Sequence, residues 1–375
     1  MKKVTKTAIK LSLLCLLLIF SRSAKAENYP VKSAGYWTKP TMSLEETQNL
    51  AKHDLLIVDL ENQFNNYRTL LSLKKLNPKL KLICYSNPME IFLTKYGNRP
   101  WQNKIIEELT INRSAWLLKT ITPIKKPANN WKRLKTFILK LPDKEENYAI
   151  FWSGMIMTNM SSACPKINGE IYSNWISKKL TAEILSDPIW DGYFMDNGTA
   201  NISWIHPNNI DIDGDKSADN NKLVDQKWQQ GMENFLRQIR RLKGKDFIIL
   251  SNKGDLNFLN QVDGKLLENF PNDYLGDKWS GGWRQCLQNA KITGKYTIFQ
   301  VNRSNINYGL ASALLLDNVY IAISQDDAGY FLELEVNLGL PLSPYENRGG
   351  IYYRKYQKAE IMVNPLKKIG KITLK

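Results

Sequence analysis

The stretch Trp190-Asp191-Gly192-Tyr193-Phe194-Met195-Asp196-Asn197 runs from an aromatic start through apolar residues and ends on a carboxylate and an amide. A short aromatic and apolar run with polar residues at its exit is typical of a buried strand in a parallel sheet. If the sheet closes into a barrel, the strand exits form the C-terminal face, where the catalytic groups of barrel enzymes lie. Asp196 is therefore the first catalytic candidate.

Similar apolar runs recur on both sides of this stretch, and segments with helical spacing separate them. An alternation of strands and helices predicts a parallel sheet covered by helices. The runs centre on Gly35, Ile57, Ile83, Met157, Phe194, Ile249, Leu266, Phe299 and Ile321. The run near Met157 is the most plausible accessory strand. The other eight predict an α/β fold, the (β/α)8 TIM barrel.

The chain of 375 residues is long enough for one barrel with additions. Residues 1–26 predict a signal peptide, because a Lys-rich start precedes the apolar run Leu11–Phe20 and the cleavage pattern Ala24-Lys25-Ala26. We expect cleavage after Ala26 and a secreted or periplasmic protein. Residues 27–340 predict the barrel, with a helical insertion at 90–147. Residues 341–375 predict a short β-rich tail packed on the barrel.

The formal net charge of +16 includes six basic residues and no acid within the predicted signal peptide, so the mature chain carries +10. Lysines are spread along predicted helices, and no compact basic run with interleaved aromatics stands out. This pattern argues against nucleic acid as a partner. No later run approaches the length of a transmembrane segment. We expect a monomer.

Polar residues end most of the apolar runs. Any one of them can cap a following helix, but several at one rim favour a cleft at the C-terminal face of the barrel. These exit residues are Asp59, Asn159, Asp196, Asn252, Glu268, Gln300 and Asp326.

Asp196 and Glu268 form the best pair of acids, because each directly follows a strand and precedes an asparagine. Glycosidic cleavage needs one protonated carboxyl group and one ionised carboxylate. The sequence leaves open which of the two is the acid/base and which the nucleophile. Only two histidines, His53 and His206, are present, which argues against a His-based triad or a zinc site. The chain has no Gly-x-Ser-x-Gly elbow, phosphate-binding glycine loop or dinucleotide fingerprint.

The remaining candidates would bind substrate. Tryptophan rings can serve as sugar platforms, although core packing explains each one at least as well. The candidate platforms are Trp37, Trp152, Trp204 and Trp279. The predicted substrate-binding residues are Trp37, Asp59, Trp152, Asn159, Asn197, Asp219, Asn252, Gln300 and Asp326.

The acidic loop Asp211-x-Asp213-Gly214-Asp215-x-x-x-Asp219 can supply carboxylates to Ca²⁺, but it departs from the EF-hand spacing. A polar turn over the cleft, with Asp219 capping or touching substrate, is the default interpretation. We therefore expect neither a metal nor another cofactor.

The chain resembles the hypothetical glycoside hydrolase family 15, a group of TIM-barrel glycosidases. The resemblance covers roughly residues 35–365, and Asp-Gly-x-Phe-x-Asp-Asn at 191–197 is its most specific part. Further matching segments are the loop 211–219, the helix with Trp228 and Gly231-Met232, Ser251-Asn252, Leu266–Phe270, Leu338–Pro341 and Val363–Pro365.

The chain is more distantly similar to the endo-α-1,4-polygalactosaminidase family. That resemblance implies catalytic acids after strands four and six, which correspond to Asp196 and Glu268.

These observations predict a secreted glycoside hydrolase that cleaves a polysaccharide or oligosaccharide with a carboxylic acid pair. One alternative is a carbohydrate-binding or envelope polysaccharide-assembly protein on a barrel without catalysis, because a fold does not determine a function. A second alternative is a metal-dependent hydrolase that uses the acidic loop.

Overall fold

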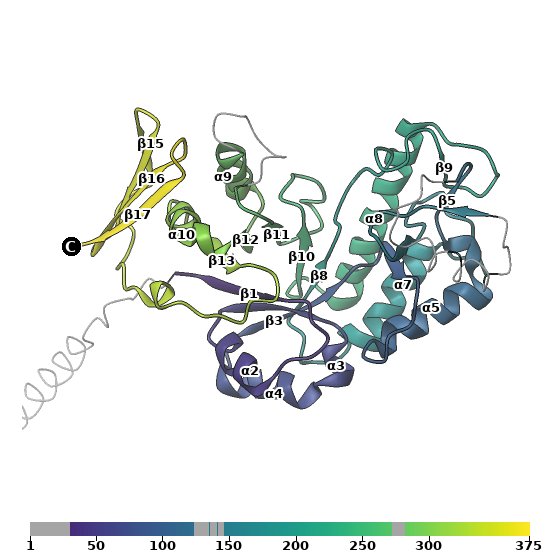
Figure 1. Ribbon diagram of the computed structural model, residues 1–375, viewed down its shortest axis with the longest axis horizontal. Helices are drawn as coiled ribbons and strands as arrows, with labels where there is room; N and C mark the ends of the chain where they lie inside the picture. The colour runs from purple at the N-terminus through teal and green to yellow at the C-terminus, as the bar shows by residue number, and fades with distance from the viewer. Residues whose placement is uncertain (1–30, 124–134, 136–140, 142–145, 272–281) are drawn as a thin grey trace, which may run out of the picture.

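The computed structural model describes residues 31–123, 135, 141, 146–271 and 282–375 (Figure 1). Eight parallel strands close into a barrel, in the order β1-β13-β12-β11-β10-β8-β3-β2. This confirms the predicted TIM barrel. The barrel strands are β1 (Ser33–Trp37), β2 (Leu55–Asp59), β3 (Lys81–Ser86), β8 (Gly192–Met195), β10 (Ile248–Asn252), β11 (Gly264–Leu267), β12 (Thr297–Val301) and β13 (Val319–Ile323).

Helices follow or separate these strands. Ser43 caps the first described helix in a full capping box with Glu46. The α-helices are α2 (Leu44–Leu50), α3 (Asn62–Asn65), α4 (Tyr67–Leu76), α5 (Pro100–Asn112), α7 (Tyr172–Leu180), α8 (Asn221–Lys243), α9 (Trp283–Ile292) and α10 (Ile306–Leu314). Shorter helical turns are η1 (Ser114–Trp116), the π-helical η2 (Thr181–Leu185), η4 (Arg303–Asn305) and η5 (Leu332–Glu335). Among the described residues, no helix has the length and apolar character that crossing a bilayer requires.

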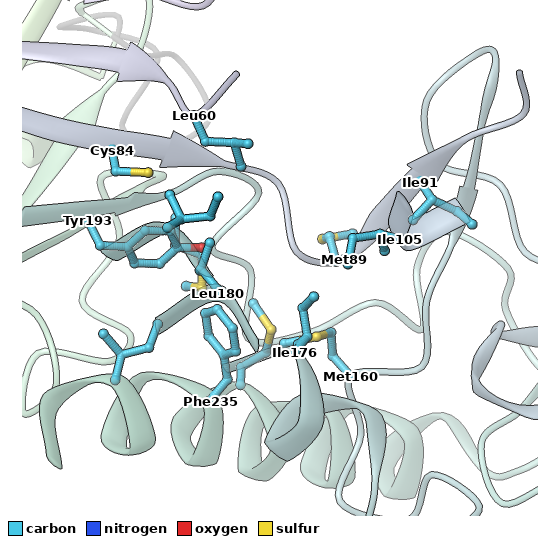
Figure 2. Packing of buried hydrophobic residues seen from close by; sticks show 14 of the residues in the cluster. Leu60, Cys84, Met89, Ile91, Ile105, Met160, Ile176, Leu180, Tyr193 and Phe235 are labelled. Carbon is cyan, nitrogen blue, oxygen red and sulfur yellow. The ribbon is translucent and has the colours of Figure 1, made fainter. Parts of the chain in front are cut away.

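Strand β8 shows how the stretch 190–197 contributes to the barrel. Side chains alternate across a strand, so Phe194 points into the barrel and its two neighbours point outward. The Phe194 ring lies 5.7 Å from Tyr36 and 5.9 Å from Tyr85, centroid to centroid. Tyr193 instead packs against Phe235 of α8, at 5.9 Å (Figure 2). Gly192 is required because a Cβ there would lie 2.5 Å from the Ile248 carbonyl oxygen.

The segment between β3 and β8 is an excursion from the barrel. The run near Met157 forms β7 (Met155–Met157), which pairs antiparallel with β4 (Glu90–Phe92) outside the barrel, so the prediction of an accessory strand is confirmed. The described part of the predicted insertion mixes helix α5 with short strands. Strand β5 (Lys119–Thr120) pairs with β6 (Asn147–Tyr148) and with β9 (Ile210–Asp211). Figure 2 shows Met89, Ile91 and Ile105 of this segment in one apolar cluster with α7.

The C-terminal residues form an antiparallel sheet in the order β14-β15-β16-β17, which agrees with the predicted β-rich tail. Its strands are β14 (Glu346–Arg348), β15 (Ile351–Lys355), β16 (Ala359–Asn364) and β17 (Ile369–Leu374). Figure 1 shows this sheet beside α10 and α9. Tyr352 packs on Trp283 of α9 with ring centroids 4.6 Å apart, and Tyr356 donates a 2.7 Å hydrogen bond to the Leu314 carbonyl of α10. The sheet and these helices therefore share one apolar core.

Candidate active site

A cleft of about 310 Å³ opens at the C-terminal face of the barrel. Asp196 follows β8, the fourth barrel strand along the chain, and Glu268 follows β11, the sixth. Both carboxyl groups line this cleft. They meet because parallel strands present all their carboxyl ends at one face.

The Asp196 carboxylate accepts three hydrogen bonds. Its Oδ1 accepts from Asn252 Nδ2 at 2.8 Å and from the Asn197 backbone N–H at 2.8 Å, and its Oδ2 accepts from the Tyr85 hydroxyl. These donors come from β10, from the β8 exit and from β3. Three hydrogen bonds therefore fix the orientation of the carboxylate. A group that attacks or deprotonates a reacting atom needs such a fixed orientation.

Glu268 lies in a different environment. Burial raises its pKa, and the nearby negative charge of Asp196 raises it further, while hydrogen bonds to the side chains of Asn252 and Tyr36 oppose this. A raised pKa keeps a carboxyl group protonated at higher pH, which suits a proton donor. The Asn252 side chain bonds to both acids and so joins them in one network.

Two tyrosines that line the cleft bond to the acids. Burial raises the pKa of the Tyr36 and Tyr85 hydroxyls well above the ordinary value, and the Asp196 charge adds to this. Both hydroxyls therefore stay protonated and act as hydrogen-bond donors. Tyr36 bonds to Glu268 and Tyr85 bonds to Asp196, so each acid has a phenol hydroxyl as a hydrogen-bond partner.

The cleft lining also holds an ion pair. Arg99, which precedes α5, donates from Nη1 to Asp59 Oδ2 at 3.0 Å. Burial raises the pKa of Asp59, and Arg99 acts in the opposite direction. Asp59 Oδ1 also accepts the Glu61 backbone N–H at 2.8 Å. Both partners line the cleft, so this pair gives the acidic site one cation.

Glu90 of β4 lies just behind the cleft and is only 3% exposed. Its carboxyl accepts hydrogen bonds from Asn87 Nδ2 at 2.9 Å, Asn197 Nδ2 at 3.0 Å and the Trp152 backbone N–H at 2.9 Å. Burial raises its pKa to about 7. Glu90 thus connects the excursion to the loop that carries Asp196.

The structure brings part of the predicted site together. Six predicted residues line the cleft: Asp59, Trp152, Asp196, Asn197, Asn252 and Glu268. Five predicted substrate-binding residues are not among its described lining: Trp37, Asn159, Asp219, Gln300 and Asp326. Trp279 lies outside the described residues.

Strand geometry explains why two of the predicted residues do not line the cleft. Trp37 is 1% exposed and packs in the helix layer, because alternation along β1 turns Tyr36, not Trp37, toward the cleft. Asn159 follows β7, which is not a barrel strand, and its Nδ2 donates to the Ile212 carbonyl at 2.7 Å. Both residues are predicted to bind substrate, but the structure places neither of them in the lining of the cleft.

The other three predicted residues outside the cleft lining accept hydrogen bonds from backbone N–H groups. Gln300 Oε1 accepts the Asn269 N–H at 2.7 Å, which holds the loop after Glu268. Asp326 Oδ1 accepts the Thr38 N–H at 2.5 Å and so ties the exits of β13 and β1 together. Asp219 Oδ2 accepts the Ile212 N–H at 2.8 Å. These side chains shape loops rather than line the cleft.

The acidic loop forms a separate feature. Carboxylate oxygens of Asp211, Asp213 and Asp215 lie within 4.8 Å of one another. Asp211 also accepts the N–H groups of Gly214 and Lys216, at 2.7 and 3.1 Å. The three acids are not part of the cleft lining, so the loop does not supply carboxylates to the Asp196 and Glu268 network.

Sequence reasoning missed several cleft residues. Tyr36 and Tyr85 lie inside predicted strands, and the period-2 alternation could have identified them as inward-facing. Arg99 lines the cleft and Glu90 lies just behind it. Both come from the excursion, where no local signal indicates proximity to the barrel exits. Phe92 and Gln325 also line the cleft.

Comparisons with solved structures give matches at low identity. A maltogenic α-amylase from Thermotoga neapolitana is 10% identical over 90% of this chain and 86% of its own, with a TM-score of 0.49. A dextranase from Flavobacterium johnsoniae is 10% identical over 82% of this chain and 38% of its own, also with a TM-score of 0.49. An α-N-acetylgalactosaminidase from Bifidobacterium bifidum is 8% identical over 91% and 57%, with a TM-score of 0.46. The chain thus spans under two fifths of the dextranase's length.

Curated protein sequences give no match to this chain. A protein-family model, the hypothetical glycosyl hydrolase family 15, matches residues 74–360. The matched region contains both Asp196 and Glu268 and extends over more than half of the 375 residues. The chain therefore belongs to the hypothetical glycosyl hydrolase family 15 and is a glycosidase.

Proposed function

We propose that this glycosidase cleaves a polysaccharide or oligosaccharide with Glu268 as the general acid and Asp196 as the nucleophile or base. One observation carries the proposal: two acids after the fourth and sixth barrel strands line a single cleft and share Asn252. Glycosidic hydrolysis needs this combination of one carboxyl that gives up a proton and one that meets the anomeric centre.

The chemistry follows from the two environments. Glu268 gives its proton to the glycosidic oxygen while the bond from that oxygen to the anomeric carbon breaks. In one route Asp196 attacks the anomeric carbon, and water then breaks the Asp196–carbon bond while giving its proton to Glu268. In the other route water attacks the anomeric carbon directly and gives its proton to Asp196, and Glu268 regains a proton from solvent as Asp196 releases one. Water supplies the hydroxyl of the new reducing end, and the carboxyl groups return to their starting states. Tyr85 and Asn252 keep Asp196 in place through these steps.

The proposal is tested with a polysaccharide panel of dextran, amylose, polygalactosamine and polygalacturonate. The wild-type chain and the Glu268→Gln variant are incubated with each polymer, and molecular weight is followed by size-exclusion chromatography. We expect the wild type to shorten at least one polymer and the variant to leave it intact. Equal binding by both proteins without cleavage would instead support the carbohydrate-binding alternative.

The activity should fall at alkaline pH. Glu268 must be protonated to act as an acid, so kcat/KM is lost as pH rises through its pKa, which burial and Asp196 raise above the ordinary value of 4.5. Tyr36→Phe removes a hydrogen bond that lowers this pKa, and the alkaline limb should therefore move to higher pH. Tyr353→Phe, in the C-terminal sheet, is the matched control. If the alkaline limb of the kcat/KM profile stays in place or moves to lower pH in Tyr36→Phe, the assignment of Glu268 as the general acid is contradicted.

We expect the protein to bind its polymer substrate outside the cytoplasm. The sequence pattern of residues 1–26, which lie outside the described residues, supports export with cleavage after Ala26. N-terminal sequencing of the mature protein should then begin at Glu27. A mature chain that still begins at Met1 would overturn this part of the proposal.

A further inference from the structure

Two large aromatic side chains beside the cleft are more than half exposed. Trp152 lines the cleft and is 54% exposed, and Trp204 in the loop after β8 is 56% exposed. An indole ring carries a large apolar face, and leaving it in water forgoes the free energy that burial would provide. Two such rings next to a substrate cleft are therefore candidates for a ligand contact.

Both indoles contact the same ring, that of the partly buried Phe151. Phe151 lies between them, with its ring centroid 5.0 Å from that of Trp152 and 5.5 Å from that of Trp204. The Phe151 and Trp204 rings meet edge to face, at 89°. We call Trp152, Phe151 and Trp204 the aromatic row. It starts in the cleft and continues along the loop after β8.

Hydrogen bonds hold both ends of the row. The Trp152 backbone N–H donates to Glu90 at 2.9 Å, and its indole Nε1 donates to Asn197 Oδ1 at 3.4 Å. The Trp204 indole Nε1 donates to the Asn201 carbonyl at 3.2 Å. The rings are thus fixed before any ligand arrives, which reduces the entropy lost on binding.

One histidine joins the two segments that carry the row. His206 Nε2 lies 3.0 Å from the Ile150 carbonyl oxygen and 3.2 Å from its N–H. It therefore connects the residue before Phe151 with the loop two residues after Trp204. The histidine is half-buried, and this contact explains its presence without a role in catalysis.

We propose that the aromatic row is an outer binding surface for an extended glycan chain, continuous with the catalytic cleft. The proposal rests on the proposed function and adds that the substrate is a polymer whose sugar rings continue from the cleft over Phe151 to Trp204. The apolar C–H faces of pyranose rings match flat indole faces. The amide side chain of Asn197 stands at the cleft end of the row, where it can meet sugar hydroxyls.

A glycan suits this surface better than a protein partner for two reasons. First, the row is continuous with the cleft through Trp152, so one linear ligand can occupy both. Second, the row consists of three rings, whereas stable protein interfaces bury about 800 Å² on each partner. Binding to a protein but to no glycan is therefore an outcome that would overturn the proposal.

The test measures binding without cleavage. Affinity gel electrophoresis uses dextran, amylose, polygalactosamine and polygalacturonate in the gel, and every protein carries Glu268→Gln. We expect at least one polymer to retard the parent, and Trp152→Ala or Trp204→Ala to weaken that binding about tenfold each, as loss of one stacked indole implies. Trp204→Phe, which keeps a ring, should restore most of the retardation. Phe64→Ala, which removes a 48% exposed ring on α3, is the control.

Equal retardation of the parent and both alanine variants would overturn the proposal, and so would the absence of retardation by every polymer. Thermal unfolding of each variant shows whether the fold is kept, and Trp204→Phe separates ring loss from misfolding. The proposed function fails separately: if the wild type cleaves no polymer but retardation still depends on both tryptophans, the aromatic row stands and the catalytic assignment falls.

Discussion

Glu268→Gln is expected to lower kcat/KM on the polymer by about 10²–10⁴-fold, because the glutamine amide cannot donate the proton that the leaving oxygen needs. The exchange preserves the size of the side chain and its place beside Asn252 and Tyr36. Asp196→Asn should lower activity at least as strongly, because the amide is neither a nucleophile nor a base. The rates are measured as new reducing ends on the polymer that the wild type shortens.

The leaving group separates the two roles. With an activated aryl glycoside of the same sugar, departure needs little help from an acid, so Glu268→Gln should keep far more activity than it does on the polymer. Asp196→Asn should be inactive on both substrates. Glu346→Gln, on the exposed strand β14, is the control and should behave as the wild type. Equal losses on both substrates for Glu268→Gln would contradict its assignment as the acid.

Gly231→Ala is expected to destabilise the protein by at least about 3 kcal/mol, through overpacking. Gly231 lies within α8, and a Cβ built there would be 1.7 Å from the Met160 carbonyl oxygen. This contact is with backbone, so the helix or the 160–161 loop must move. Helix propensity acts the other way, since alanine is favoured over glycine by about 1 kcal/mol, and the net effect remains unfavourable.

The effect is measured by urea or thermal unfolding. Gly97→Ala is the matched control, because a Cβ there meets no atom within 4 Å, and it should leave the midpoint nearly unchanged. If Gly231→Ala unfolds at or above the wild-type midpoint, the helix propensity of alanine outweighs the steric contact at this position. That result would contradict the close approach of α8 to Met160.

Much of the barrel could be predicted because its strands are buried on both faces. Such strands appear as short apolar runs, and all eight barrel strands lie where such runs are centred. The same logic placed Asp196 and Glu268 at exits, and the closed sheet brings the exits together. The length of a run does not reveal which sheet it joins, so Asn159 is predicted at the rim although it follows the accessory strand β7.

The rest of the cleft depends on information that is not local. Trp37 and Tyr36 are adjacent, and a difference of one residue decides which faces the cleft. Arg99 and Glu90 reach the site from the excursion after β3, whose packing against the barrel depends on contacts distant in sequence. Gln300 lies within β12, one residue before its end, and Asp326 follows β13, but their oxygens bond to backbone N–H groups of neighbouring loops.

The central claim is that Asp196 and Glu268 together hydrolyse a glycosidic bond. Its most direct test is the molecular weight of each polymer in the panel after incubation with the wild type, Asp196→Asn or Glu268→Gln at equal concentration. We expect the wild type to shorten at least one polymer, while either variant leaves the same polymer at full length over the same time. Shortening by either variant at the wild-type rate would contradict the account, and so would failure of the folded wild type to shorten any polymer.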